Sequence, residues 1–260
     1  MNTADVKQAV RHAGDSEALE WAARTGYAVS GLMHLLIAWI ALQLALGAHR
    51  KQADQSGALQ TLASNGLGIV LLWVAVFGFA GLALWMLTRV VLGPGAGERV
   101  KSAAKAVVYL ALAWTALGFA TGKGTSSERK TGDVTASLMS KPAGGALVIV
   151  VGLVVLGVAV YHVYKGWSRR FLRDLRSHPG GAVVAAGRFG YIAKGVALGV
   201  VGALFVLAGL HNDPKQAGGL DKGLRTLLDV PFGKVLLGVV ALGLAAYGLY
   251  SFGRARHGEV

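Results

Sequence analysis

Residues 67–87 read LGIVLLWVAVFGFAGLALWML, a stretch without a single charged side chain. A helix that crosses the roughly 30 Å hydrocarbon core of a bilayer needs about 20 mostly apolar residues. A helix on the surface of a soluble bundle carries a polar stripe instead. This stretch has the required length and no such stripe, so it predicts a membrane-spanning helix and argues against a soluble helical bundle.

The composition of the whole chain agrees with this interpretation. The 260 residues are 54% apolar and only 15% charged, with a mean hydropathy of +0.53. A soluble domain typically has about 25% charged residues. Five further apolar runs resemble the first in length or fall slightly short of it. We therefore predict six spans, near residues 27–46, 67–87, 106–120, 143–163, 195–210 and 235–252.

The six spans form three copies of a two-span unit. A tyrosine marks each odd-numbered span, and Tyr27, Tyr109 and Tyr191 are 82 residues apart each time. Each even-numbered span opens at a glycine, has an aromatic residue 17 positions later and a cation four positions after that. Such pairs are typical of a membrane–water interface, so we expect these tyrosines, aromatics and cations to be interface anchors. The glycines are Gly68, Gly144 and Gly233, the aromatics are Trp85, Tyr161 and Tyr250, and the cations are Arg89, Lys165 and Arg254.

This pattern predicts the fold class. The chain is expected to be an all-α, polytopic membrane protein whose six transmembrane helices form three tandem two-helix repeats with approximate threefold pseudosymmetry. Each repeat crosses the bilayer twice, so all three share one orientation. The expected segments are an N-terminal segment at 1–20, repeat 1 at 21–98, repeat 2 at 99–181, and repeat 3 with a short tail at 182–260.

The distribution of cations predicts the orientation. The net charge is +13. If Lys194 and Lys234 at the span ends are set aside, 15 Lys and Arg fall on the side that holds both termini and nine on the other. The excess places both termini in the cytoplasm and favours contact with anionic lipid. No recognition motif for nucleic acid accompanies the charge.

Short motifs rich in small and apolar residues occur at 23–27 with Gly31, at 187–191 with Gly195, at 57–62 and at 230–237. They resemble motifs of the bacterial membrane proteins classed as domain of unknown function 1206, which are common in actinobacteria. The second repeat departs most, because it keeps Tyr109 but lacks the glycine before it. The resemblance implies a multi-pass protein of the bacterial cell membrane built from tandem two-span repeats, and it implies no activity.

Four polar residues within or beside the spans are candidate ligand-binding residues. His34 is an ionisable residue inside the first span, which makes it a candidate functional residue. A hydrogen bond from His34 to a neighbouring helix is the competing interpretation, as it is for Gln43. Lys194 and Lys234 would attract an anion or reach to the interface. No predicted span contains Asp or Glu, and the chain has no cysteine, so we expect no metal site, no cofactor and no catalytic residues.

Two functions remain open at this stage. The first is a non-enzymatic scaffold or accessory protein that binds membrane lipid, most readily anionic lipid at the cytoplasmic face, or binds another membrane protein or a further copy of itself. The second is a transporter or channel with a pathway along the pseudo-threefold axis for anionic solutes or lipids. An enzyme is the weakest hypothesis, since no nucleophile–base pair is evident.

Overall fold

The computed structural model describes residues 5, 8, 10, 16–48 and 51–258, so most of the predicted N-terminal segment 1–20 lies outside the described part. Within these residues the secondary structure is helical apart from one isolated bridge between Leu175 and Gly258. Six of the described helices are long and apolar enough to cross a membrane. This confirms the all-α fold with six spans. They are α2 (Glu17–Ala45), α4 (Gly66–Leu92), α5 (Ala96–Ala120), α7 (Gly144–Trp167), α8 (Gly181–Leu210) and α10 (Gly233–His257).

Three helices begin about ten or more residues earlier than the sequence predicts. Helices α2, α5 and α8 start at Glu17, Ala96 and Gly181, whereas the apolar runs begin near residues 27, 106 and 195. The added turns of α5 carry charged side chains, including Lys101 and Lys105, which hydropathy alone does not assign to a span. The connection between α4 and α5 is therefore only a short turn at residues 93–95.

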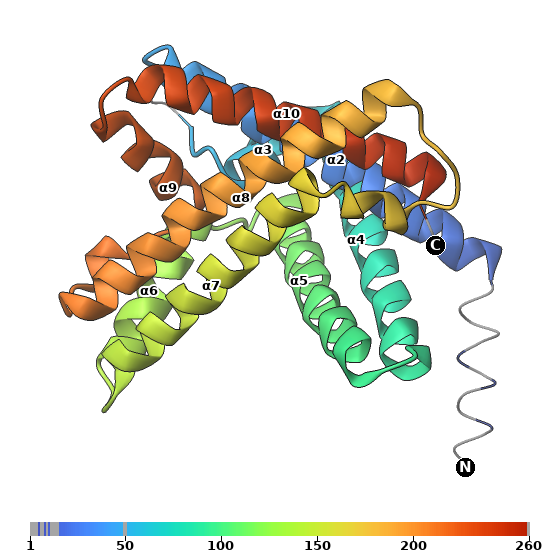
Figure 1. The fold of residues 1–260 in the computed structure, drawn as a ribbon, viewed down its shortest axis with the longest axis horizontal. Coiled ribbons are helices and arrows are strands. Elements are labelled where there is room, and N and C mark those ends of the chain that lie inside the picture. Colours follow the sequence, from blue (N-terminus) through green and yellow to red (C-terminus); the bar gives the residue numbers. More distant parts are fainter. Residues whose placement is uncertain (1–4, 6–7, 9, 11–15, 49–50, 259–260) are drawn as a thin grey trace.

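The helices pack as a ring in which each repeat contacts the next. The most extensive packing joins α4 to α5, α7 to α8, and α10 to α2, and each of these pairs connects two different repeats. Figure 1 shows these three pairs running side by side, with the start of α2 and the end of α10 at the right. We call this the terminal end and the opposite end, at the left, the loop end. The ring accounts for the approximate threefold arrangement.

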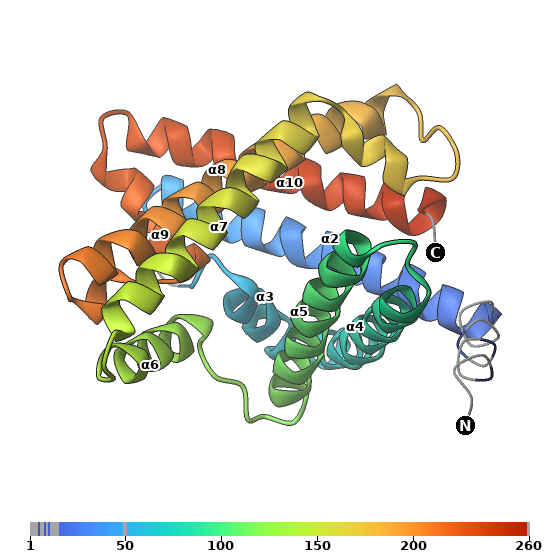
Figure 2. The same cartoon turned by 60° about the horizontal axis from the view of Figure 1, so that its bottom comes forward.

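Packing within a repeat occurs in repeats 1 and 3. Helix α2 packs on α4, and α8 packs on α10, but α5 and α7 have no packing of comparable extent. Figure 2 shows α5 and α7 diverging from each other, as they also do in Figure 1. Repeat 2 is therefore open where the other two repeats are closed.

Glycines explain the closed hairpins. Gly26 lies against Gly78, and a Cβ added at Gly78 would lie 3.0 Å from the Cα of Gly26. A Cβ added at Gly190 would lie 2.5 Å from backbone atoms of Tyr247, which is too close for any side chain. Small residues of this kind let helices in lipid approach each other closely.

Repeat 2 has valines at the equivalent positions. Val108 precedes Tyr109 as Gly26 and Gly190 precede their tyrosines. Val154 follows Gly144 by ten residues, as Gly78 and Gly243 follow the glycines of their own spans. Val108 is 56% exposed and Val154 is 62% exposed. Two β-branched side chains thus occupy the positions where a close helix pair needs glycine.

All three repeats share one turn before the even-numbered span. A Cβ at Gly68, Gly144 or Gly233 would collide with the carbonyl oxygen of the leucine six residues earlier. This explains why leucine and glycine recur at a fixed spacing. The leucines are Leu62, Leu138 and Leu227.

The interior of the ring is apolar. One cluster of buried side chains joins α2, α4, α5, α8 and α10 with the short helices α3 (Gln55–Ala63) and α9 (Leu220–Thr226). Burial of such side chains away from water or lipid allows close van der Waals packing. The largest fully buried members are Ile37, Leu44, Leu59, Leu72, Leu82, Leu224, Leu237 and Leu244.

The loop end is closed by helical connections, whereas helices are predicted from the sequence only for the six spans. Each hairpin connection holds a short helix: α3, α6 (Ser127–Met139), and α9 with its flanking 3-10 turns η2 (Pro214–Gln216) and η3 (Leu227–Asp229). The side chain of Asp54 caps α3 by accepting from Gly57 N at 2.9 Å, and Ser126 caps α6 by accepting from Arg129 N at 3.3 Å. These N-caps satisfy backbone donors at the helix starts.

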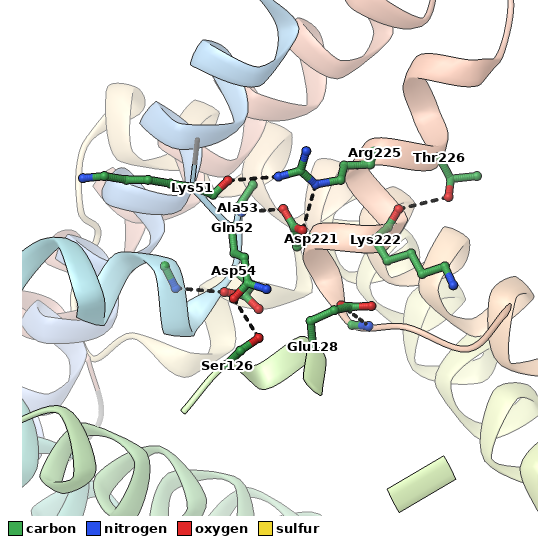
Figure 3. Close-up of polar contacts among 12 residues, drawn as sticks. Lys51, Gln52, Ala53, Asp54, Ser126, Glu128, Asp221, Lys222, Arg225 and Thr226 are labelled. Carbon is green, nitrogen blue, oxygen red and sulfur yellow. Dashed lines mark hydrogen bonds and ion pairs between the residues drawn. The ribbon is translucent and has the colours of Figure 1, made fainter. Parts of the chain in front are cut away.

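Hydrogen bonds tie the three connections to one another (Figure 3). Asp221 on α9 accepts from Ala53 N at 2.7 Å, and Ser126 donates to Gln52 at 2.9 Å. Glu128 on α6 accepts from the backbone N–H of residue 219, the N-cap of α9, at 3.0 Å. Every pair of repeats is therefore linked at this end.

Asp54, at the centre of these contacts, is 1% exposed, and its Oδ2 has no hydrogen-bond partner within the described part of the chain. Burial raises the pKa of this carboxyl, and the nearby charge of Asp221 acts in the same direction.

Candidate functional site

The cations that recur in the three repeats converge on one cavity. Arg89, Lys165 and Arg254 lie on the last turns of α4, α7 and α10. The helix ring brings these turns together at the terminal end, where they line a cavity of about 340 Å³ with Tyr27 of α2 and residues of α5. The 3-10 helix η1 (Arg170–Asp174), which follows α7, adds further lining side chains. Residues expected to be separate interface anchors thus contribute to one site.

The cavity is strongly cationic. Seven of its lining side chains carry a positive charge and two, Glu98 and Asp174, carry a negative charge. A partly enclosed surface with such a surplus concentrates anions. The cations are Arg89, Lys101, Lys105, Lys165, Arg170, Arg173 and Arg254.

Asp174 offsets part of this charge. Its Oδ2 lies 2.6 Å from Lys165 Nζ and 3.9 Å from Arg254 Nη1. Burial alone would raise the pKa of this carboxyl, but Arg254 and Lys165 outweigh that effect and hold the pKa below its ordinary value. Glu98 pairs with Lys101 at 3.1 Å. Even with both acids paired in this way, four of the cations, namely Arg89, Lys105, Arg170 and Arg173, form no ion pair with an acid of the lining.

The repeated tyrosines support these cations across repeat boundaries. The Arg254 guanidinium lies 4.2 Å from the ring centroid of Tyr27, and Lys165 Nζ lies 5.0 Å from that of Tyr191. Each pair joins the cation of one repeat to the tyrosine of the next. Cations stack favourably on the negative face of an aromatic ring. Among the described residues the corresponding stacking of Arg89 on Tyr109 does not form.

Several expected anchors face the protein and not the lipid. Tyr27, Tyr191 and Tyr250 are at most 3% exposed. Tyr191 and Tyr250 pack with Phe171 and Tyr247 in an aromatic cluster, and Tyr250 donates a hydrogen bond to the carbonyl of Phe171 at 3.3 Å. Trp85 and Tyr109 are partly buried and Tyr161 is exposed. The anchoring role stays a prediction for those three.

Two hydrogen-bond donors in the cavity wall lack acceptors among the residues that the structure describes. They are Nε1 of Trp85 and Nε of Arg254, and both atoms are buried. Leaving a buried donor unpaired costs about 1–3 kcal/mol. An acceptor such as a phosphate oxygen would satisfy them, so the cavity fits an anionic ligand by hydrogen bonding as well as by charge.

Two of the four candidate residues from the sequence meet at a separate place. Lys194 Nζ lies 3.4 Å from His34 Nε2 and 4.2 Å from the ring centroid of Tyr247. His34 Nδ1 lies 2.7 Å from the carbonyl of Ser30, so Nδ1 donates there and Nε2 accepts from the lysine. The rings of Tyr247 and Tyr191 are in contact at 5.1 Å, so they connect this pair to the Lys165 side of the cavity.

The other two candidates are elsewhere. Gln43 lines a pocket at the loop end together with Lys51 and Thr61. Lys234 is exposed in the first turn of α10. The described residues contain no group of three or more His, Asp or Glu placed to hold a metal ion. The four residues therefore do not form a single site, and the cavity is a site that they do not predict.

Comparison with known proteins identifies the same three units. The sequence profile of a family described as "Domain of Unknown Function (DUF1206)" matches residues 25–93, 100–169 and 189–258. An uncharacterized protein of Bacillus subtilis (strain 168), YxxB, is 29% identical over 229 residues, which cover 83% of this chain and 82% of that protein. No solved structure matches the chain.

Proposed function

The chain belongs to the DUF1206 family, and from that premise we propose that it is a non-enzymatic membrane protein that binds a phosphate-bearing anion in the cavity at its terminal end. The cationic surplus of this cavity, to which equivalent residues of all three repeats contribute, carries the proposal. The unpaired donors on Trp85 and Arg254 support it.

The proposed location is the bacterial plasma membrane, with both termini in the cytoplasm. The excess of Lys and Arg on the side of the termini supports this orientation. The cavity then lies at the cytoplasmic leaflet, where anionic lipid headgroups and phosphorylated solutes are both available. Binding of this kind suits a scaffold or accessory subunit, whose partner would be lipid, a second membrane protein or another copy of the chain.

A transporter with a pathway along the pseudo-threefold axis has less support. Such a pathway would have to cross the apolar cluster that joins five of the six spans, in which Leu72, Leu82 and Leu244 are buried. An anion in that cluster would lose its hydration without gaining a charged partner.

The test is stabilisation of the purified protein by phosphate-bearing probes. In a neutral detergent, inorganic phosphate, glycerol 3-phosphate and dihexanoyl phosphatidic acid are each titrated while thermal unfolding is followed by tryptophan fluorescence. A ligand at 100 times its dissociation constant stabilises the folded state by about 2.7 kcal/mol. We expect at least one probe to raise the melting temperature in a saturable manner.

Matched variants show whether the cavity is responsible. Arg89→Gln removes a half-buried cavity cation, and Arg173→Gln removes an exposed one whose loss should leave folding intact. Lys234→Gln removes a cation outside the cavity. The cavity variants should weaken binding by about tenfold each, equivalent to 1.4 kcal/mol, and Lys234→Gln should not. Absence of stabilisation by every probe, or equal loss in all three variants, would reject the proposal.

A further inference from the structure

We infer that the ligand is an anionic glycerophospholipid, whose phosphate headgroup reaches the cavity sideways between α5 and α7 while its acyl chains stay in the seam between these helices. This inference rests on the proposed function and names the source of the anion. It starts from the one place where the ring of repeats is open.

The seam exists because repeat 2 lacks the close helix contact of the other repeats. Gly26 and Gly78 bring α2 against α4, whereas Val108 and Val154 occupy the equivalent positions on α5 and α7. Since the glycine positions face the partner span in the closed repeats, the two valines mark the facing sides of α5 and α7. Both valines are more than half exposed, so the facing sides are not covered by each other.

The seam leads to the cavity. Lys101 and Lys105 of α5 and Tyr161 and Lys165 of α7 all line the cavity. The same two helices that diverge along their length therefore both line the cationic site. Figures 1 and 2 both show α5 and α7 diverging from each other.

The chemistry of the seam changes along its length in the way an amphiphile requires. From residue 106 to 120 on α5, and from 144 to 164 on α7, there is no Asp, Glu, Lys or Arg. The cations begin at Lys105 and Lys165, where these helices reach the cavity. An anionic phospholipid presents the complementary pattern, with a phosphate at the interface and hydrocarbon below it. A soluble phosphate would use only the cationic part.

The experiment compares ligands that share a phosphate and differ in hydrocarbon. Dihexanoyl phosphatidic acid and glycerol 3-phosphate are titrated against the full chain in neutral detergent, and dissociation constants are taken from the thermal shifts. Each buried methylene contributes about 0.8 kcal/mol, so the lipid should bind at least about 100-fold more tightly than glycerol 3-phosphate. Retention of long-chain phosphatidic acid over phosphatidylcholine by native mass spectrometry should follow the same preference.

Bulky substitutions in the seam separate this inference from the proposed function. Val154→Trp fills the seam, and Val235→Trp places the same side chain on an exposed site of α10. We expect Val154→Trp to weaken lipid binding by about tenfold or more, as the loss of two or three methylene contacts would, and to leave glycerol 3-phosphate binding unchanged. Val235→Trp should change neither.

Each outcome decides one of the two claims. If glycerol 3-phosphate binds as tightly as the lipid, or if Val154→Trp has no effect on lipid binding, the sideways lipid site is wrong and the anion site stands. If no phosphate-bearing probe binds, both are wrong. If lipid binds tightly and Val154→Trp alone weakens it, the inference holds.

Discussion

Repeat 2 and its two neighbours have the same sequence plan and pack differently. Repeats 1 and 3 close their hairpins through Gly26 and Gly190, while repeat 2 carries Val108 at that position and leaves α5 and α7 apart. The open repeat is also the one that supplies two walls of the cationic cavity. The comparison indicates that the positions at which repeat 2 differs from the other repeats, and not the positions that all three share, open a route to the cationic cavity.

The largest expected loss of stability comes from placing valine, the residue of the open repeat 2, at the equivalent glycine of the closed repeat 1. Gly26→Val places a branched side chain against Leu82 and the backbone of α4. Overpacking of this kind should lower the free energy of unfolding by about 3 kcal/mol or more. The measurement is thermal or SDS-induced unfolding in detergent, followed by tryptophan fluorescence.

The matched control is Val108→Ala in repeat 2, an exposed position. It should change the free energy of unfolding by no more than about 0.5 kcal/mol. An equal loss in the free energy of unfolding for Gly26→Val and Val108→Ala would show that the glycine is not what closes repeat 1.

A smaller effect concerns the cation–tyrosine pairs between repeats. In a double-mutant cycle, Arg254→Met with Tyr27→Leu should give a coupling of about 1–2 kcal/mol, because the partly buried guanidinium stacks on the ring. The equivalent cycle of Arg89 and Tyr109 should give a coupling near zero. A coupling of similar size in both cycles would contradict the difference between these two repeat boundaries.

At the loop end, hydrogen bonds attach α6 of repeat 2 to α3 of repeat 1, and their contribution to stability can be measured. Ser56 donates to Asp54 at 2.7 Å and accepts from Ser127 N at 3.1 Å, which links α3 of repeat 1 to α6 of repeat 2. Ser56→Ala should lower the free energy of unfolding by about 1 kcal/mol and speed amide hydrogen exchange in α6 more than in α9. Ser64→Ala, at an exposed site with only a local bond, is the control, and equal exchange in α6 and α9 would argue against this link.

The smallest expected effects are on the pH dependence of stability, which should have opposite signs for Asp174 at the terminal end and Asp54 at the loop end. The pKa of Asp174 is held low by Lys165 and Arg254, so its contribution to stability is present above the ordinary carboxyl pKa and lost as pH falls. The pKa of Asp54 is raised by burial, so the folded state binds the proton more tightly and stability is lost as pH rises through that pKa.

Asparagine variants test these signs, since each removes the charge and keeps an oxygen acceptor. At neutral pH, Asp54→Asn should melt above the native protein and Asp174→Asn below it. Both differences should shrink as the pH is lowered toward the titration of the carboxyl groups. Melting curves between neutral and acidic pH provide the measurement, and the same sign for both variants would contradict the assignment.

The sequence was enough to predict the six spans and their threefold repetition, because long apolar runs and the spacing of Tyr27, Tyr109 and Tyr191 are local features. It placed the starts of α2, α5 and α8 too late, because charged residues such as Glu20 in α2 and Lys101 in α5 lower the local hydropathy, although Lys101 faces a cavity. The helices α3, α6 and α9 were missed, although Asp54 and Ser126 are recognisable as N-cap residues.

The cavity could not be predicted in the same way. The recurring positions of Arg89, Lys165 and Arg254 were visible, and they were interpreted as separate anchors. Their convergence depends on which helices pack together, and the tightest pairs join different repeats. The one local signal of the open seam was the missing glycine before Tyr109, whose meaning depends on the contact that Gly26 makes with α4.

The most direct test of the central claim is the separation of the two helices within a repeat. The chain has no cysteine, so spin labels can be placed at chosen sites alone. Val107 and Val160 in repeat 2 are equivalent to Phe189 and Leu249 in repeat 3, and all four are exposed. In lipid nanodiscs, double electron–electron resonance should give a longer distance for the pair in repeat 2 than for the pair in repeat 3. Equal distances would show that repeat 2 is closed, and would contradict the account.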